Sequence, residues 1–64
     1  MRPREVVKLI RAHGWRYLYT NGGHAHFEHP TLLGKVTVPQ HPGDINPNIV
    51  KLILRQAGIK KEDV

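Results

Sequence analysis

The sequence predicts a small α+β domain, in the order helix, strand, strand, strand, helix, with two helices packed on one face of a three-stranded antiparallel sheet. Apolar residues recur at helical spacing near both ends of the 64-residue chain. In the middle they alternate with polar residues, as in strands, and an Asn-Gly-Gly turn at residues 21–23 separates two alternating segments. Since so short a chain can build only one modest core, we expect one domain over residues 1–64.

The first helix is expected to begin at Pro3, which suits a first helical turn, and to end at Gly14. Its apolar face follows the spacing i, i+3, i+4 and i+7, which selects Val6, Leu9, Ile10 and His13.

The first strand is predicted from Trp15 to Thr20, where residues alternate between two faces. One face carries Trp15, Tyr17 and Tyr19. We expect Trp15 in the core, whereas the two tyrosines can either pack in the sheet or stack on nucleobases. Residues 21–23 accept positive φ and connect this strand to the next as a hairpin.

The second strand is predicted from His24 to about Glu28, with Ala25 and Phe27 facing the core and His26 sharing the opposite face with His24 and Glu28. A third strand covers residues 35–38, with both valines inward, and we expect Pro39 to end its ladder because proline has no N–H to donate.

The second helix is expected to start with Asn46 as N-cap and Pro47 as its first residue, and to stop at Gly58. Its predicted inner face comprises Ile49, Leu52, Ile53 and Gln56. The closing residues 60–64 are expected to fray.

The composition narrows the function classes. Ten Lys and Arg against five Asp and Glu give a net charge of +5, which suits a polyanionic partner but also an ordinary solvated surface. The absence of cysteine removes disulfides and thiolate zinc sites. No apolar run approaches the roughly 20 residues that span a bilayer, and the first residues lack the apolar stretch of a signal peptide, so a cytoplasmic location is expected.

His24 directly follows the glycine turn, where a side chain that exchanges protons near neutral pH can act on RNA. It can take the proton of a ribose 2'-hydroxyl and start internal cleavage without a metal. Gly22 and Gly23 allow a nucleic-acid backbone to come close and expose main-chain N–H groups to it. The alternative is an ordinary exposed strand histidine.

The other histidines leave several alternatives open. His26 is a second proton-transfer group, a phosphate contact or a solvent-facing residue. His41 either lines the same surface as His24 or hydrogen-bonds its loop. His13 is expected to cap or pack at the first helix end. A metal site from His24, His26 and Glu28, with His29 or His41, has suitable side-chain types but no recognised ligand spacing, so none is predicted.

Four segments together cover nearly the whole chain. They are His13-Gly14-Trp15, residues 22–30 around Gly22-Gly23-His24, Val36-Thr37-Val38-Pro39-Gln40-His41, and residues 49–59 with Gln56-Ala57-Gly58-Ile59. In this order they resemble the HicA toxin family. The resemblance implies a fold like a double-stranded-RNA-binding domain and messenger-RNA cleavage without a metal or other cofactor. It also implies a HicB-like antitoxin that covers the surface around His24 and forms a hetero-oligomer with the toxin. In this family the antitoxin and toxin often repress their operon together.

The family's catalytic histidine matches His24, which we therefore expect to be catalytic. We expect RNA contacts from Gly22, Gly23, His26 and Lys35. Gly23 stands where the family usually has Ser or Thr, so a missing hydrogen bond worth about 1 kcal/mol is expected to lower activity several-fold. The alternative function is a non-catalytic RNA-binding or protein-interaction module of the same fold.

Overall fold

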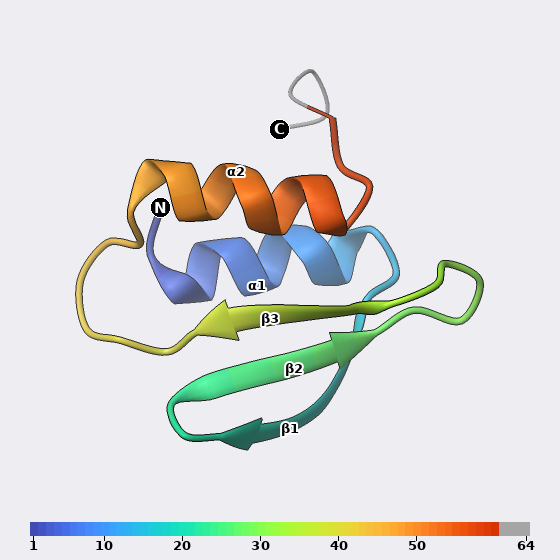
Figure 1. The fold of residues 1–64 in the computed structure, drawn as a ribbon, viewed down its shortest axis with the longest axis horizontal. Helices are drawn as coiled ribbons and strands as arrows, with labels where there is room; N and C mark the ends of the chain where they lie inside the picture. Colours follow the sequence, from blue (N-terminus) through green and yellow to red (C-terminus); the bar gives the residue numbers. More distant parts are fainter. Residues whose placement is uncertain (61–64) are drawn as a thin grey trace.

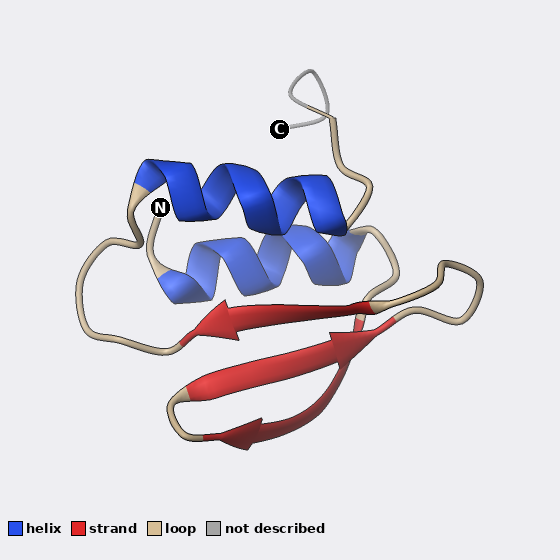
Figure 2. Ribbon diagram, viewed as in Figure 1, coloured by secondary structure: helices blue, strands red, loops and turns tan. Residues whose placement is uncertain are grey.

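The computed structural model describes residues 1–60 and has two layers, with both helices on one face of the sheet (Figures 1 and 2). The elements are α1 (Pro3–Ala12), β1 (Arg16–Asn21), β2 (His24–Glu28), β3 (Lys35–Pro39) and α2 (Pro47–Gln56). The strands lie in the order β1-β2-β3, and both pairs are antiparallel. The predicted fold class, like a double-stranded-RNA-binding domain, is confirmed. The predicted fraying concerns residues that, beyond Lys60, lie outside this range.

Both helices start as predicted. The Arg2 backbone N–H donates to Glu5 Oε1 at 2.8 Å, and Pro3 follows as the first helical residue of α1. At α2 the Asn46 side chain accepts from the Asn48 N–H at 2.8 Å. These contacts satisfy N–H groups that lack a partner within the first turn of a helix.

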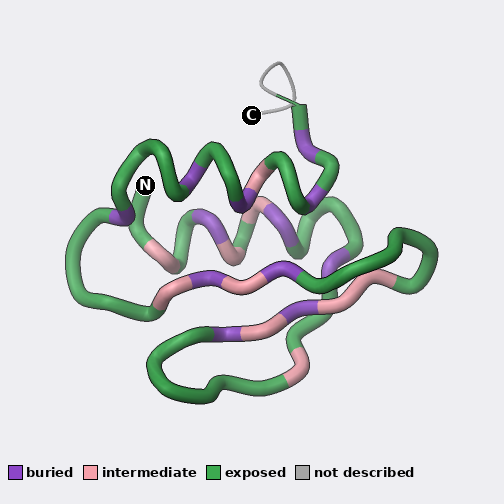
Figure 3. The backbone as a smooth tube through the Cα atoms, viewed as in Figure 1, coloured by how far each residue is buried: buried purple, intermediate pink, exposed green. Residues whose placement is uncertain are grey.

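The core lies between the helices and the sheet, and burial alternates along β2 and β3 as predicted (Figure 3). The buried strand residues are Ala25, Phe27, Val36 and Val38. From α1, Val6 and Ile10 are fully covered, while Leu9 is half-buried and His13 is exposed.

The predicted inner face of α2 was largely wrong. Ile53 is buried as predicted, but Ile49 and Leu52 are 40% and 52% exposed. The other buried positions are Val50 within the helix and Ala57 at its C-cap. Residues 49–54 are apolar except for Lys51, so two overlapping helical stripes fit the sequence. The stripe 50, 53, 54 and 57 is apolar throughout, whereas the predicted one ends in a glutamine, and burial favours the former.

The predicted alternation along β1 was also wrong beyond its midpoint. Tyr17 pairs with Phe27, but Tyr19 pairs with His26, so β1 advances two residues where β2 advances one. Leu18 is therefore the extra residue of a β-bulge, which reverses the alternation that follows it. As a result Tyr19 lies on the outer sheet face, away from the helices, and not on the same face as Tyr17.

His29 fastens the loop after β2 to the end of α1. Its Nε2 lies 3.0 Å from the carbonyl oxygen of His13, while its Nδ1 accepts from the backbone N–H groups of Thr31 and Leu32 at 3.1 and 3.2 Å. Nδ1 therefore carries no proton, and Nε2–H is the donor to His13. Gly14 leaves room for this ring, since a Cβ there would lie 2.7 Å from His29 Nε2.

Gly14→Ala is expected to destabilise the domain by about 2–3 kcal/mol, because it combines positive φ with displacement of the His29 ring. Gly14 has φ +95°. Gly34→Ala is the matched control, since Gly34 has φ +84° and open space around a Cβ. Urea unfolding followed by circular dichroism gives both values. Equal destabilisation by the two substitutions would show that the His29 contact has no energetic weight.

Candidate functional site

The hairpin turn between β1 and β2 lies at the same end of the molecule as the starts of both helices and the loop after β3 (Figure 1). Its two residues, Gly22 and Gly23, have φ +59° and +77°, and a Cβ on either would meet nothing within 4 Å. The Gln40 backbone N–H donates to the Gly23 carbonyl at 2.7 Å. The turn is therefore open to an approaching molecule while the loop after β3 holds it in place.

His24 is the first residue after this turn and is exposed. Its Nδ1 lies 3.0 Å from the carbonyl oxygen of Gly22. Because a carbonyl oxygen only accepts, Nδ1 must carry the proton of this contact. In the neutral ring the lone pair is then on Nε2, which is the nitrogen able to take a proton from a substrate.

His41 lies beside His24, although it is 17 positions later in the sequence. The two ring centroids are 6.0 Å apart, and the ring planes are nearly perpendicular at 83°. Pro39, the last residue of β3, pairs with His24 and brings the following loop to this position. Of the two sequence interpretations of His41, the structure therefore favours the surface shared with His24.

His26 occupies the next outward position of β2, in a row that crosses all three strands. Its ring stacks on Tyr19 with centroids 4.6 Å apart and planes 20° from parallel. Its Nδ1 is 3.3 Å from Thr37 Oγ1. His26 is thus half-buried, with one ring face and one nitrogen already engaged.

Lys35 lies on the same sheet face but at the opposite end of the strands. It pairs with Glu28, whose Oε2 is 3.7 Å from a guanidinium nitrogen of Arg16. Glu28 is four residues from His24 along β2, which is about 13 Å at the rise of a strand. The structure therefore groups Gly22, Gly23 and His24 closely, with His26 nearby and Lys35 apart from them.

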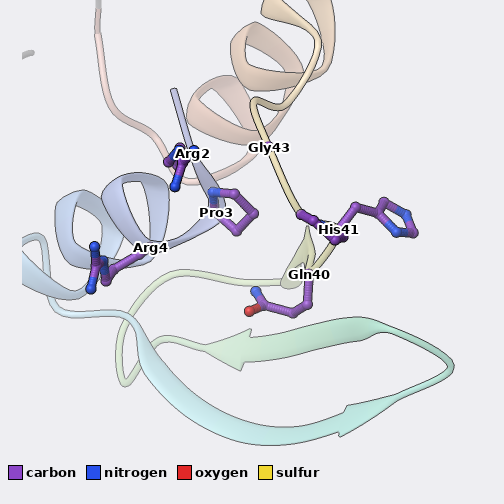
Figure 4. Close-up of a pocket in the computed structure, with 7 residues that line it drawn as sticks. Arg2, Pro3, Arg4, Gln40, His41 and Gly43 are labelled. Atoms are coloured by element: carbon purple, nitrogen blue, oxygen red, sulfur yellow. The ribbon is translucent and has the colours of Figure 1, made fainter.

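A pocket of about 390 Å³ opens next to His41, between the start of α1 and the loop after β3 (Figure 4). Two arginines line it from the helix side. The lining residues are Arg2, Pro3, Arg4, Gln40, His41, Pro42 and Gly43. In the sequence these arginines contribute only to the net charge, because their position at this pocket depends on the tertiary fold.

The residues considered as metal ligands do not come together. Within residues 1–60, no group of three or more His, Cys, Asp or Glu side chains is arranged to hold a metal ion. Both ring nitrogens of His29 are engaged by backbone and Thr31 groups, as described above. Over the same residues, no helix has the length and apolar character needed to cross a membrane.

A family model described as the HicA toxin of bacterial toxin-antitoxin systems matches residues 3–59. The chain belongs to the HicA toxin family. It is therefore a toxin of a toxin–antitoxin system, and family membership implies an antitoxin partner. The comparison with curated proteins gave no match.

The matched range of this HicA-family chain includes the glycine turn, His24 and His41. It also includes Gly23, the second residue of the turn. The structure gives a backbone reason for glycine here, since the two-residue turn requires positive φ at both positions. An L-residue at Gly23 would cost about 1–2 kcal/mol in that conformation.

Proposed function

We propose that this HicA-family protein is an endoribonuclease that cleaves messenger RNA without a metal, with His24 as its general base. The observation that carries the proposal is the contact between His24 Nδ1 and the Gly22 carbonyl. It leaves Nε2 of the neutral ring as an exposed proton acceptor at an open turn. Transfer of a 2'-hydroxyl proton to Nε2 makes that oxygen the nucleophile that attacks the adjacent phosphorus.

The surface around His24 is suited to an RNA strand. Gly22 and Gly23 present no side chains, so the phosphate backbone can come within reach of main-chain N–H groups. On the outer sheet face the ring pair of Tyr19 and His26 offers a surface for base stacking. Lys35, at the far end of this face, would contact a more distant phosphate.

The partner in the cell is proposed to be a HicB-like antitoxin that covers this surface and forms a hetero-oligomer with the toxin. Both act in the cytoplasm, where messenger RNA is available. The net charge of +5 supports attraction to RNA and to any acidic segment of the antitoxin.

The test is cleavage of a messenger-RNA transcript by the purified protein in excess chelator. We expect the same rate with chelator as with Mg²⁺, and products that end in 2',3'-cyclic phosphate and 5'-hydroxyl. A DNA strand of the same sequence should stay intact because it lacks the 2'-hydroxyl.

Two results would contradict this function. Loss of cleavage on chelation would contradict a metal-free mechanism. RNA binding without cleavage, weakening steeply as salt rises, would favour the alternative of a non-catalytic RNA-binding module, whereas binding of a protein with little salt dependence would favour an interaction module.

A further inference from the structure

Two contacts place His41 next to the turn at residues 22–23, one made by the backbone of the preceding residue and one by the His41 ring. The Gln40 N–H donates to the Gly23 carbonyl at 2.7 Å, which fixes the residue before His41 against the turn. The His41 side chain is exposed, and its ring meets the ring of His24 at a centroid distance of 6.0 Å. A phosphoryl group lying over the turn can therefore reach both imidazoles.

His26 is the other histidine close to His24, but its ring is less available. It is half-buried, stacked on Tyr19 at 4.6 Å, and its Nδ1 is 3.3 Å from Thr37 Oγ1. Proton transfer needs a ring nitrogen that can approach the reacting oxygen to about 2.6–3.2 Å. The exposed ring of His41 meets this need better.

The pocket that His41 helps to line also carries two arginines. Arg2 and Arg4 line it on the helix side, and residues 40–43 line it on the loop side (Figure 4). Two acidic residues lie near this lining: the Glu5 carboxylate accepts from the Arg2 backbone N–H, and the exposed Asp44 directly follows Gly43. In Figure 4 the His41 imidazole points away from Arg2 and Arg4, so these arginines add positive charge at this end of the molecule without touching the ring.

We propose that His41 is the second proton-transfer residue of the cleavage, acting as general acid on the leaving group. This inference rests on the proposed ribonuclease function. The 2'-hydroxyl gives its proton to His24 Nε2 while its oxygen bonds to phosphorus. The bond from phosphorus to the 5'-oxygen breaks, and that oxygen keeps the electron pair and takes a proton from the His41 imidazolium. The products are a 2',3'-cyclic phosphate and a 5'-hydroxyl, and water returns each histidine to its starting form.

The experiment uses two oligonucleotides that span a mapped cleavage site. One is ordinary RNA, and in the other a sulfur atom replaces the 5'-oxygen of the scissile bond, so that the leaving group departs without being protonated. On ordinary RNA, His41→Ala is expected to lower the cleavage rate by about 10²-fold or more, as for loss of a general acid. On the sulfur-bridged RNA the cleavage rate of the same variant should lie within about tenfold of the wild-type rate. His24→Ala should be impaired on both.

Several results would overturn the assignment. If His41→Ala lowered the cleavage rate equally on the two substrates, His41 would have a binding or structural role. If it lowered the rate on neither, His41 would have no role in cleavage. Recovery of His24→Ala in place of His41→Ala would exchange the two roles. If the wild type cleaves neither RNA, the proposed ribonuclease function is wrong. If the wild type cleaves RNA but His41→Ala does not show the expected rates, only the role of His41 is wrong. Unchanged thermal unfolding of His41→Ala, an exposed loop substitution, excludes misfolding as the cause of a loss.

Discussion

Replacement of His24 by alanine is expected to lower the RNA cleavage rate by about 10²- to 10⁴-fold, the usual contribution of a positioned general base. At 1.36 kcal/mol per factor of ten, this is about 3–5 kcal/mol of transition-state stabilisation. The ring is exposed and its one hydrogen bond is to a local carbonyl, so its removal should change stability by less than about 1 kcal/mol. Single-turnover cleavage of a labelled transcript measures the rate, and circular dichroism measures the stability.

The matched control is His13→Ala. His13 is also exposed, and its Nδ1 likewise lies 3.0 Å from a local backbone carbonyl, that of Leu9. It follows α1 at the end of the molecule opposite the glycine turn (Figure 1). We expect this variant to cleave at the wild-type rate. If His24→Ala kept full activity, or if both variants lost it equally, His24 would not be the base.

The sequence predicted the fold well because its local signals agree with one another. The Asn-Gly-Gly turn, the alternation in β2 and β3 and the Asn46-Pro47 start of α2 each specify one local structure. The two errors arose where local signals allow more than one structure. Residues 49–54 are apolar at almost every position, so only packing selects the phase of α2. A bulge at Leu18 leaves no signature in a pattern of alternating residues.

The site could be predicted only in part for a similar reason. His24 follows directly from the turn and the strand, which are local features. Its closeness to His41 depends on the pairing of β2 with β3, and the place of Arg2 and Arg4 depends on how α1 packs. The tautomer of His24 can be assigned only from the distance between its Nδ1 and the Gly22 carbonyl oxygen. Such contacts between distant segments arise from tertiary structure, which periodicity cannot supply.

Trp15→Ala is expected to destabilise the domain by about 4–6 kcal/mol, a large part of its total stability. Trp15 is 2% exposed, its Nε1–H donates to the Ala57 carbonyl at 3.0 Å, and its ring meets the His29 ring edge-on at 5.2 Å. Truncation of a buried tryptophan to alanine costs about 3–5 kcal/mol, and loss of the hydrogen bond adds about 1 kcal/mol. At about 0.05–0.15 kcal/mol per residue, a chain of this length has a total stability of roughly 3–10 kcal/mol.

Two further variants separate the parts of this effect. Trp15→Phe keeps an aromatic ring in the core but loses the hydrogen-bond donor to Ala57, so the free energy of unfolding is expected to fall by about 1–3 kcal/mol. Leu33→Ala is the control for truncation as such, because Leu33 is 99% exposed, and a change within 0.5 kcal/mol is expected. Urea unfolding followed by far-ultraviolet circular dichroism compares all three without relying on tryptophan fluorescence. If Trp15→Ala unfolded at the wild-type urea midpoint, the burial of this ring and its hydrogen bond to Ala57 would not contribute to stability.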